Sequence, residues 1–371
     1  QDQSSLVLSN STQADVKEEE IVPGAEKNFS MKYGKEKSEF EKTPTKYDRS
    51  EPPFGEPPLL ELPKVWRGDL SNGIKLYGIE NNELPMIQFT MRIDGGQALD
   101  PEGKEGVALL LGSMLKEGTK DRTPAELEEA IDLLGSSISL SVGLEGMYIS
   151  GNTLAKNFNE TISIMTEMLT EPRWDEQAFE IVKNRRINSI KQRRTNAQSV
   201  AFSALARQLY GPGHPASTPL GGTEFSVNSI TMEDLKNYFS SNLSPKVSHF
   251  HIAGDIKQTT AQRLLGQLSQ AWKGEKVNIP KIPRVEPPSK PKVFFIDIPD
   301  AKQSAISVGT LTIPGNDPEL FKLTVVNNRL GGGMEARLMR TLRLEKGYTY
   351  GAGSFLRANS FQTPFYAYSQ V

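Results

Sequence analysis

The chain has 371 residues, of which 37% are hydrophobic, and its 43 basic side chains nearly balance its 45 acidic ones. At roughly 100–200 residues per domain this length predicts two domains, and the small net charge excludes a general attraction to nucleic acid or to an anionic membrane. Cysteine is absent, which excludes thiol catalysis, disulfides and cysteine-based zinc sites, and which suits an oxidising compartment such as a bacterial periplasm or cell envelope.

The N-terminal part of the sequence shows no sign of a folded domain or of a membrane anchor. Residues 1–60 are polar, charged and proline-bearing without helical or strand periodicity, which predicts a linker or tail. The sequence begins at Gln1, with neither an initiator methionine nor a signal segment, so we interpret it as a processed product or a fragment. No run of 18 or more apolar residues occurs anywhere, so no membrane span is predicted.

Residues 61–275 predict a first α+β domain, in which short β-rich runs alternate with helices. Capping boxes mark the starts of two helices: Thr123-Pro-Ala-Glu126, with proline in the first turn, and Thr231-Met-Glu-Asp234. The predicted elements are strands over 76–80 and 86–93, helices over 106–116 and 123–134, a hairpin over 138–154, helices over 157–170, 175–210 and 231–239, a strand over 247–252 and a helix over 259–272.

A proline-rich linker over 276–290 precedes a second unit that opens in the same way as the first. Strands over 292–298 and 304–313 and a helix over 319–330 repeat the order strand, strand, helix. Residues 291–371 therefore predict the start of a second α+β domain. We expect an α+β fold of two related units, each with an antiparallel-rich sheet packed by helices. The second unit is much shorter, so it is expected to be incomplete, with part of its core elsewhere.

The three histidines do not form a recognisable catalytic or metal site. His249 and His251 lie two apart in a predicted strand and face the same side, as two metal ligands could, but that strand contains no carboxylate. We interpret them as ordinary strand histidines. His214 lies in the rigid turn Gly211-Pro-Gly-His-Pro215, where a structural role is expected. Neither a Ser-His-Asp arrangement nor an H-E-x-x-H helix is found.

Phosphate and nucleic-acid sites are also not indicated. The glycine-rich pieces 221–223 and 331–333 lack the G-x-x-x-x-G-K-S/T pattern of a phosphate-binding loop. The basic stretch over 183–194 lies on a predicted helix, where its charges are spread around the axis without interleaved aromatic residues. We therefore interpret this stretch as a solvated helix face.

Residues 94–119 resemble the zinc-motif region of M16 metallopeptidases, the insulinase, pitrilysin and mitochondrial-processing-peptidase-like family. In that family a strand ending in glycine is followed by a helix carrying H-x-x-E-H and then by Gly-Thr. The two histidine ligands fall on Leu109 and Ser113, the catalytic glutamate falls on Gly112, and the third ligand falls near Ser189. Leucine, serine and glycine can neither bind zinc nor act as a general base, so the resemblance implies a degenerate motif and no metal in this chain.

Other segments resemble the same family in the same order. Residues 214–224 and 229–235 are similar to its turn and capped helix, and residues 251–255 are similar to its closing strand. The resemblance covers about residues 65–371. It implies the M16 (LuxS/MPP-like) fold, with a first M16-like domain over 61–275 and the start of a second after the linker.

The segment 330–350 resembles the M16 pattern in which an arginine and a tyrosine seven residues apart complete the active site from the opposite half. By this resemblance Tyr350 would donate its hydroxyl to the oxyanion at the scissile carbonyl, and Arg343 would hold the substrate backbone. Without the resemblance, Arg343 would be interpreted as an exposed cation at the end of a helix and Tyr350 as an aromatic residue of a strand. A tight helix exit is the main role expected for Gly331, Gly332 and Gly333, and substrate contact is a secondary one.

The resemblance implies the non-zinc half of an M16-type endopeptidase, inactive on its own. It would close against a zinc-bearing half, either a separate subunit or another part of the same polypeptide, to form a chamber for unfolded peptides. The chain would hold no cofactor, and zinc is expected in the partner half. Two alternatives stay open: a purely structural subunit, like the core proteins of respiratory complexes, and a peptide-binding module without hydrolysis. No nucleic-acid partner is expected.

Overall fold

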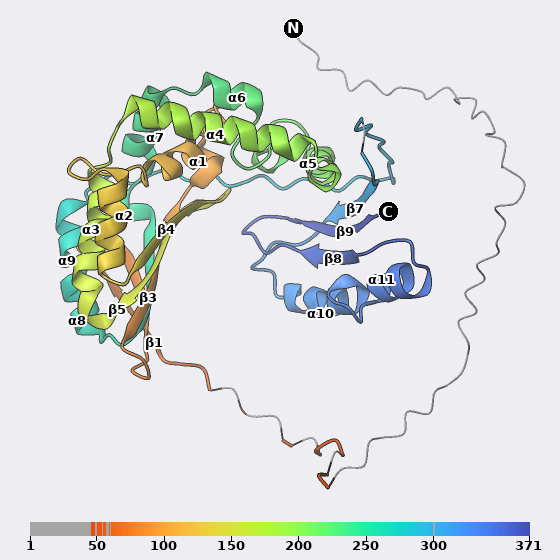
Figure 1. The fold of residues 1–371 in the computed structure, drawn as a ribbon, viewed down its shortest axis with the longest axis horizontal. Coiled ribbons are helices and arrows are strands. Elements are labelled where there is room, and N and C mark those ends of the chain that lie inside the picture. The colour runs from red at the N-terminus through yellow and green to blue at the C-terminus, as the bar shows by residue number, and fades with distance from the viewer. Residues whose placement is uncertain (1–45, 49, 54, 57–58, 60, 300) are drawn as a thin grey trace, which may run out of the picture. The chain divides into compact units, whose positions relative to one another are not determined.

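The computed structural model describes residues 46–48, 50–53, 55–56, 59, 61–299 and 301–371. The chain divides after Leu62 into two units. Among the few described residues of the first unit there is no helix or strand, and the predicted linker or tail over 1–60 lies largely outside the described residues. The second unit, from Pro63 onward, contains two β-sheets with their helices (Figure 1).

The first sheet has six strands in the spatial order β1-β2-β6-β3-β5-β4, with β2 and β6 parallel and the other pairs antiparallel. Its two faces differ, because apolar and polar residues alternate along the strands. In β3, Ile87, Phe89 and Met91 are buried, while Gln88 and Thr90 point to the other face. The strands are β1 (Val65–Asp69), β2 (Lys75–Glu80), β3 (Met86–Asp94), β4 (Ser137–Val142), β5 (Gly146–Leu154) and β6 (Ser248–Gly254). These bounds confirm the strands and the hairpin predicted for the first domain.

Helices cover the apolar face of the first sheet, and Figure 1 shows α2, α3, α8 and α9 along one side of it. Their buried residues, such as Phe158 and Leu268, form one core with the apolar residues of the strands. Both predicted capping boxes are formed. The helices are α1 (Val107–Met114), α2 (Pro124–Leu133), α3 (Phe158–Thr170), α4 (Glu176–Arg194), α5 (Ala197–Tyr210), α6 (Glu224–Ser229), α7 (Met232–Asn242), α8 (Gln258–Leu264) and α9 (Gly266–Ala271), with short 3-10 turns at η1 (Gly96–Leu99), η2 (Ala155–Asn157), η3 (Pro215–Ser217) and η4 (Pro245–Val247).

Two helices that the sequence predicts as continuous are interrupted. The predicted helix over 175–210 is wrong, because the Asn196 side chain accepts a 2.8 Å hydrogen bond from the Ser199 N–H and so begins α5 as a separate helix. Asparagine competes with the helical backbone for hydrogen bonds, which favours this new start. The predicted helix over 259–272 likewise divides into α8 and α9 at Leu265.

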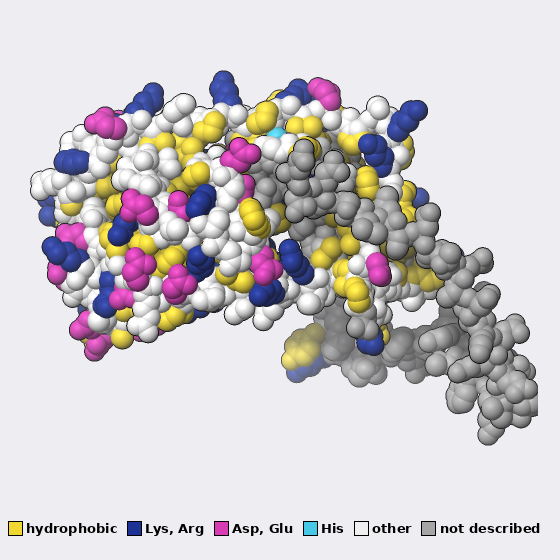
Figure 2. Space-filling model, turned by 90° about the horizontal axis from the view of Figure 1, so that it is seen from above, with side chains coloured by type: hydrophobic (Ala, Val, Ile, Leu, Met, Phe, Trp, Pro, Cys, Tyr) yellow, Lys and Arg dark blue, Asp and Glu magenta, His cyan; other side chains and the backbone are white. Residues whose placement is uncertain are grey.

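The basic residues of α4 are bound at different places along the helix and form no common site. Lys191 and Arg194 both lie 3.4 Å from the Glu224 carboxylate, and the Arg186 Nε donates a 2.8 Å hydrogen bond to the Gly221 carbonyl. Figure 2 shows basic and acidic side chains interspersed on the face that carries α4 and α6. This arrangement agrees with the predicted solvated helix face. Among the described residues, none of the helices has the length and hydropathy needed to cross a bilayer.

The second sheet has three antiparallel strands in the order β7-β9-β8. The strands are β7 (Ala305–Leu311), β8 (Ala352–Leu356) and β9 (Pro364–Gln370); the helical segments are α10 (Leu320–Gly331), α11 (Arg337–Met339) and the π-helical turn η5 (Arg340–Glu345). Both α10 and α11 contact β8. The strand predicted over 304–313 and the helix predicted over 319–330 are confirmed. So is the expected α+β class, with a sheet and helices on each side of the linker.

The strand predicted over 292–298 is wrong. These residues form no strand, and the apolar side chains of Val293 and Phe295 are exposed, Phe295 by 82%. A run rich in Val, Ile and Phe favours a strand only where a neighbouring backbone offers hydrogen bonds, and no described strand pairs with this run. The apolar run is therefore left in solvent.

Helix α5 packs against the second sheet and the linker. The Phe202 ring packs against the Tyr366 ring of β9 with centroids 5.2 Å apart. At the end of α5, the Tyr210 ring stacks on the His214 ring at 4.5 Å, and the His214 Nε2 lies 3.2 Å from the Pro283 carbonyl of the linker. Burial lowers the pKa of His214. The structural role predicted for His214 is confirmed, since its ring fastens the linker to α5.

Candidate functional site

The residues at the predicted zinc-motif positions of α1 are packed against neighbours. Leu109 is half-buried against the core, and the Ser113 hydroxyl donates a 3.0 Å hydrogen bond to the Leu109 carbonyl within the helix. Gly112 is buried, and a Cβ atom there would lie 2.8 Å from the Cγ2 atom of Val142 in the β4–β5 hairpin. Real Cβ atoms essentially never approach another atom so closely. A glutamate at position 112 would therefore require the Val142 side chain of the hairpin to move.

Ser189, at the position of the third ligand, lies half-buried on α4, which packs against α1. Glu117, which follows α1, and Arg185, near the middle of α4, form an ion pair of 3.7 Å. The fold thus brings together the helices that carry the four predicted positions. Their leucine, glycine and serine side chains do not fit a zinc ion, which needs imidazole or carboxylate ligands here. Throughout the part of the chain that the structure describes, no group of three or more His, Cys, Asp or Glu side chains could hold a metal ion.

Asp100 holds the N-terminus of α1 from outside the helix. Its carboxylate accepts hydrogen bonds from the Gly106 N–H at 2.6 Å and from the Ala108 N–H at 3.0 Å, which satisfies donors that the start of a helix leaves free. Burial raises the pKa of Asp100 to about 7, and it outweighs the opposite effect of the two hydrogen bonds. The start of α1 therefore depends on a carboxyl group that is costly to ionise.

Replacing Asp100 with asparagine is expected to remove a pH dependence of stability between about pH 4 and about pH 7. Because the folded-state pKa of Asp100 is raised, the folded protein binds this proton more tightly than the unfolded chain does. The stability that this proton contributes is complete below the ordinary aspartate pKa of about 3.8 and is lost as the pH rises through about 7. Urea unfolding of the wild type and of Asp100→Asn across this window measures the difference.

Asp175→Asn is the matched control, since Asp175 caps α4 by accepting a 2.8 Å hydrogen bond from the Ala178 N–H. That bond lowers the pKa of Asp175. Its stabilising effect is therefore present at neutral pH and is lost as the pH falls, which is the opposite sign. If the unfolding free energies of the wild type and Asp100→Asn change with pH in the same way between about pH 4 and about pH 7, the raised pKa of Asp100 is contradicted.

Arg343 and Tyr350 lie between α11 and β8, on a segment that opens with the π-helical turn η5. Turns of this kind are frequent at functional sites. The Gly347 N–H donates a 3.2 Å hydrogen bond to the Arg343 carbonyl and closes the turn. The Arg343 side chain is exposed, and Tyr350 is 87% exposed. Neither side chain forms an ion pair or hydrogen bond with any residue that the structure describes, so both groups are free to meet a ligand.

Thr349 anchors the backbone that carries Tyr350. Its buried hydroxyl accepts a 3.0 Å hydrogen bond from the Gly351 N–H and lies within hydrogen-bonding distance of the carbonyls of Gly351 and Gln370. Gln370 belongs to β9, so this contact ties the turn to the second sheet. The position of the Tyr350 backbone is fixed, while its ring stays in solvent.

The three glycines at the end of α10 differ in their surroundings. Gly331 is buried, and any Cβ atom there would collide with Ser354 of β8, so its close approach to the sheet requires glycine. Gly332 lies against Asn328, whereas Gly333 has no atom within 4 Å of an added Cβ. The tight helix exit predicted for the triglycine stays a prediction, since none of the three glycines has a positive φ. The substrate contact predicted for the triglycine stays a prediction, with open surroundings only at Gly333.

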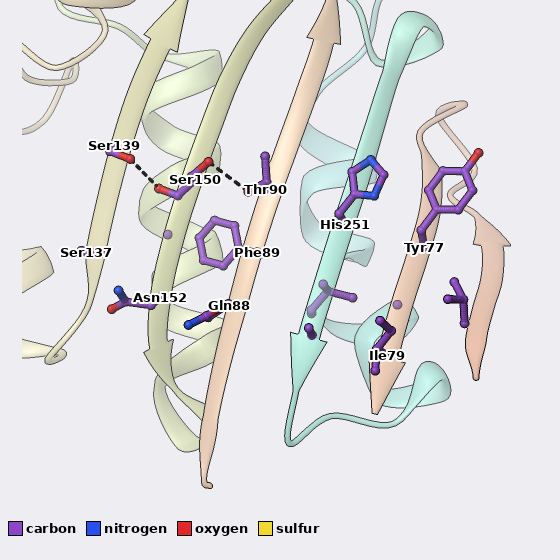
Figure 3. Close-up of a pocket in the computed structure, with 15 residues that line it drawn as sticks. Tyr77, Ile79, Gln88, Phe89, Thr90, Ser137, Ser139, Ser150, Asn152 and His251 are labelled. Atoms are coloured by element: carbon purple, nitrogen blue, oxygen red, sulfur yellow. Dashed lines mark hydrogen bonds between the residues drawn. The ribbon is translucent and has the colours of Figure 1, made fainter. Parts of the chain in front are cut away.

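The polar face of the first sheet carries a shallow groove of about 550 Å³ (Figure 3). Ser139, Ser150, Thr90, His251 and Tyr77 are adjacent in the strand register and form one row across five strands. The Thr90 and Ser150 hydroxyls lie 3.0 Å apart, and the rings of His251 and Tyr77 stack with centroids 5.1 Å apart. This row offers hydrogen-bonding groups to a ligand along its whole length. The residues lining the groove include none of the predicted site residues.

A second row of the same face is charged. The Asp94 carboxylate of β3 lies 2.7 Å from the Arg92 Nε and 3.4 Å from the His249 Nε2 of β6. Partial burial lowers the pKa of His251, and the neighbouring His249 and Arg92 contribute to this shift. The carboxylate beside His249 comes from the adjacent strand β3, so the sequence of β6 alone does not reveal it.

The chain matches two models of one peptidase family. Residues 79–224 match the one described as Insulinase (Peptidase family M16), and residues 229–371 match the one described as Peptidase M16 inactive domain. The helices α1 and α4, which carry the degenerate positions, lie within the first match, and the Arg343/Tyr350 segment lies within the second.

Similar proteins include peptidase homologues of bacteria and mitochondria. The chain is 26% identical over 294 residues to the "Non-peptidase homolog YmxG" of Helicobacter pylori (strain ATCC 700392 / 26695), covering 78% of this chain and 66% of that protein. It is 22% identical over 291 residues to the "Uncharacterized zinc protease YmxG" of Bacillus subtilis (strain 168), covering 78% and 70%. Against the mitochondrial-processing peptidase subunit beta of Bos taurus the identity is 24% over 279 residues, covering 74% of this chain but only 55% of that subunit.

Solved structures share the fold. A peptidase M16 inactive domain from Pseudomonas fluorescens superposes with a TM-score of 0.78 at 24% identity, covering 83% of this chain and 74% of that one. A protease from Helicobacter pylori superposes with a TM-score of 0.75 at 16% identity, covering 83% and 75%. The expected M16 fold is confirmed by these likenesses.

Proposed function

The chain belongs to the M16 family of peptidases, and from that premise we propose that it is the non-zinc half of a two-half endopeptidase. In this proposal it contributes Arg343 and Tyr350 to an active site completed by a zinc-bearing half. It also contributes a wall of the chamber that receives unfolded peptides. The zinc belongs to the partner, and no step of hydrolysis is assigned to the four degenerate positions of this chain.

The observation that supports the proposal is the exposed pair formed by Arg343 in η5 and Tyr350 in the turn that follows, neither of which has a partner among the described residues. An arginine and a tyrosine in solvent are ordinary, but here the buried hydroxyl of Thr349 fixes the backbone beside the exposed ring. A phenol held in this way can donate a hydrogen bond to the oxyanion that develops at a scissile carbonyl. The Arg343 guanidinium can hold the peptide backbone nearby through charge-assisted hydrogen bonds.

The polar face of the first sheet supports the role of a chamber wall. A solvated peptide keeps its own hydrogen-bonding groups hydrated, so a wall that contacts it needs donors and acceptors. The row from Ser139 to Tyr77 supplies hydroxyl and imidazole groups, and the second row adds Arg92 and His249. The same face is also the observation that favours the alternative of a peptide-binding module without hydrolysis.

The isolated chain is expected to contain no stoichiometric zinc and to cleave no peptide, because leucine, glycine and serine replace the ligands and the base. Elemental analysis of the purified chain and cleavage of unfolded casein measure both properties. The same assay is then run with a purified family member that carries H-x-x-E-H, chosen as the partner encoded beside this chain. The isolated chain is expected to cleave nothing, whereas the mixture is expected to cleave casein at a rate above that of the zinc-bearing member alone.

Three outcomes separate the proposal from its alternatives. One tight zinc ion per isolated chain would overturn the argument from the degenerate positions. A mixture no faster than the zinc-bearing member alone, with no peptide bound by the isolated chain, would favour a structural subunit. Saturable binding of peptide by the isolated chain without any gain in rate would favour the peptide-binding module.

A further inference from the structure

The polar face of the first sheet carries more basic than acidic side chains. Its strands place two carboxylates on this face, and each already has a cation. The Asp69 carboxylate lies 2.6 Å from the Lys75 Nζ. The Asp94 carboxylate lies 2.7 Å from the Arg92 Nε. Arg67, the third basic residue of this face, forms no ion pair with any residue that the structure describes. A ligand with a carboxylate therefore meets positive charge here, whereas a cationic ligand meets no carboxylate that lacks a partner.

The other side chains of this face are neutral and polar. The outward positions of β4 are Ser137, Ser139 and Ser141, and those of β3 include Gln88 and Thr90. Covering such groups with an apolar surface would leave their donors and acceptors without hydrogen bonds, which costs free energy. The composition of this face therefore favours contact with water or with a polar ligand.

Arg92 presents an open side of its guanidinium on this face. Its Nε lies against Asp94, but neither of its Nη groups donates a hydrogen bond to any residue that the structure describes. The side chain is 39% exposed. It lies over Gly146 of β5, where an added Cβ would be 3.6 Å from the Arg92 Nε. An arginine with both Nη groups free can bind a carboxylate through two parallel hydrogen bonds.

The neighbours of Arg92 in the strand register offer further hydrogen-bonding groups. Tyr148 lies opposite Arg92 on β5, and its hydroxyl makes no hydrogen bond with the described residues. His249 lies opposite Arg92 on β6. Two residues along β3, about 7 Å away, is Thr90, which belongs to the hydroxyl row of the groove (Figure 3). A peptide with a carboxylate at Arg92 can therefore reach this row with its neighbouring backbone groups.

We propose that the polar face of the first sheet binds peptide segments that carry an acidic side chain, and that Arg92 selects this side chain. The carboxylate of the segment binds to the open side of the Arg92 guanidinium, and Asp94 holds the opposite side. The backbone of the segment bonds to the hydroxyl row. This inference rests on the proposed role of the face as a wall that contacts peptides, and it adds the class of peptide that the wall prefers.

The test measures the binding of three peptides to the full chain by isothermal titration calorimetry. The peptides have twelve residues of serine, threonine and glycine, are blocked at both termini, and differ only at one central position, which is glutamate, glutamine or lysine. The wild type is expected to bind the glutamate peptide about tenfold more tightly than the glutamine peptide, because a charge-assisted pair is stronger than a neutral hydrogen bond. The lysine peptide is expected to bind no better than the glutamine peptide.

Two variants are expected to change this preference in opposite directions. Arg92→Gln combined with Asp94→Asn removes both charges without leaving a carboxylate unpaired, and it should bind the glutamate and glutamine peptides equally. Asp94→Asn alone removes the carboxylate that competes for Arg92, so the preference for glutamate should rise at least about threefold. Arg263→Gln is the matched control, since Arg263 is an exposed arginine of α8, which covers the opposite face of the sheet. The preference should be unchanged in this variant.

Equal affinities of the wild type for the glutamate and glutamine peptides would overturn the inference. So would a preference for glutamate that the double variant retains, because another cation would then select the side chain. If the double variant does not fold, an unchanged preference in Asp94→Asn overturns the role of Arg92. Failure of the wild type to bind any of the three peptides would also overturn the inference. The proposed function would then still be tested separately, by the rate of cleavage in the mixture with the zinc-bearing member.

Discussion

Replacing Tyr350 with phenylalanine is expected to slow peptide cleavage by the assembled two-half enzyme by about 100-fold. The change removes only the phenolic hydroxyl, and loss of one donor to a developing oxyanion typically costs a factor of this size in rate. Since the ring is exposed and its hydroxyl forms no hydrogen bond with the described residues, stability should not change. Steady-state kinetics with the zinc-bearing half in excess measures the effect, which should fall on kcat more than on KM.

Tyr348→Phe is the matched control for this experiment. Tyr348 lies two residues earlier on the same turn and is also exposed, but it is not at the position of the family pattern. Its rate is expected to stay within about twofold of the wild type, the scale of an ordinary surface substitution. Equal rates for the wild type and Tyr350→Phe would remove the transition-state role from the proposal and leave only a wall of the chamber.

Replacing Gly112 with glutamate is expected to lower the free energy of unfolding by about 3 kcal/mol. Overpacking of a close-packed core and burial of a carboxylate without a partner each cost of this order or less. The physical cause is the 2.8 Å approach between a Cβ at position 112 and the Val142 side chain. Urea unfolding followed by tryptophan fluorescence measures the loss. The catalytic carboxylate of the family thus cannot be restored at its own position without disturbing the hairpin.

Gly266→Glu provides the control, because Gly266 also lies in a helix and an added Cβ there meets no atom within 4 Å. This variant is expected to be neutral or slightly more stable, since glutamate favours a helix more than glycine does. Adding Val142→Ala to Gly112→Glu should recover part of the loss by opening space beside the helix. An unfolding free energy for Gly112→Glu equal to that of the wild type would show that the hairpin yields freely.

The parts of the fold that the sequence predicts well depend on local patterns. The alternation along β3 and the capping boxes at Thr123 and Thr231 act within one element, so their periodicity and hydrogen-bond chemistry can be read from neighbouring residues. The predicted helix over 175–210 fails for the opposite reason. Strong helix formers on both sides of Asn196 predict one continuous helix, although the backbone leaves the helical conformation at this single residue.

The features of the second sheet and of the candidate site that the sequence does not predict depend on contacts between residues distant in sequence. The run over 292–298 has the composition of a strand, but a strand exists only where another backbone pairs with it, and composition does not report that. The degenerate positions of α1 are evident from residue identity. That the Val142 side chain occupies the space beside Gly112 is not, because Val142 belongs to a hairpin about 30 residues away in the sequence. The hydrogen-bonding row is not predicted from the sequence, because alternation within one strand does not show which polar residues of different strands lie side by side, although serine recurs at every second position of β4.

The anchoring of Tyr350 through Thr349 has an entropic consequence. The polypeptide at this turn is held by the hydroxyl of the preceding residue, so the phenol itself keeps its rotational freedom about χ1 and χ2 in water. Immobilising such a side chain upon association costs about 0.5–1.5 kcal/mol. A ligand that encloses the aromatic ring must supply this free energy from its other contacts. A short ligand that leaves the ring mobile avoids this cost, but it then lacks a hydrogen-bond donor held in a fixed position.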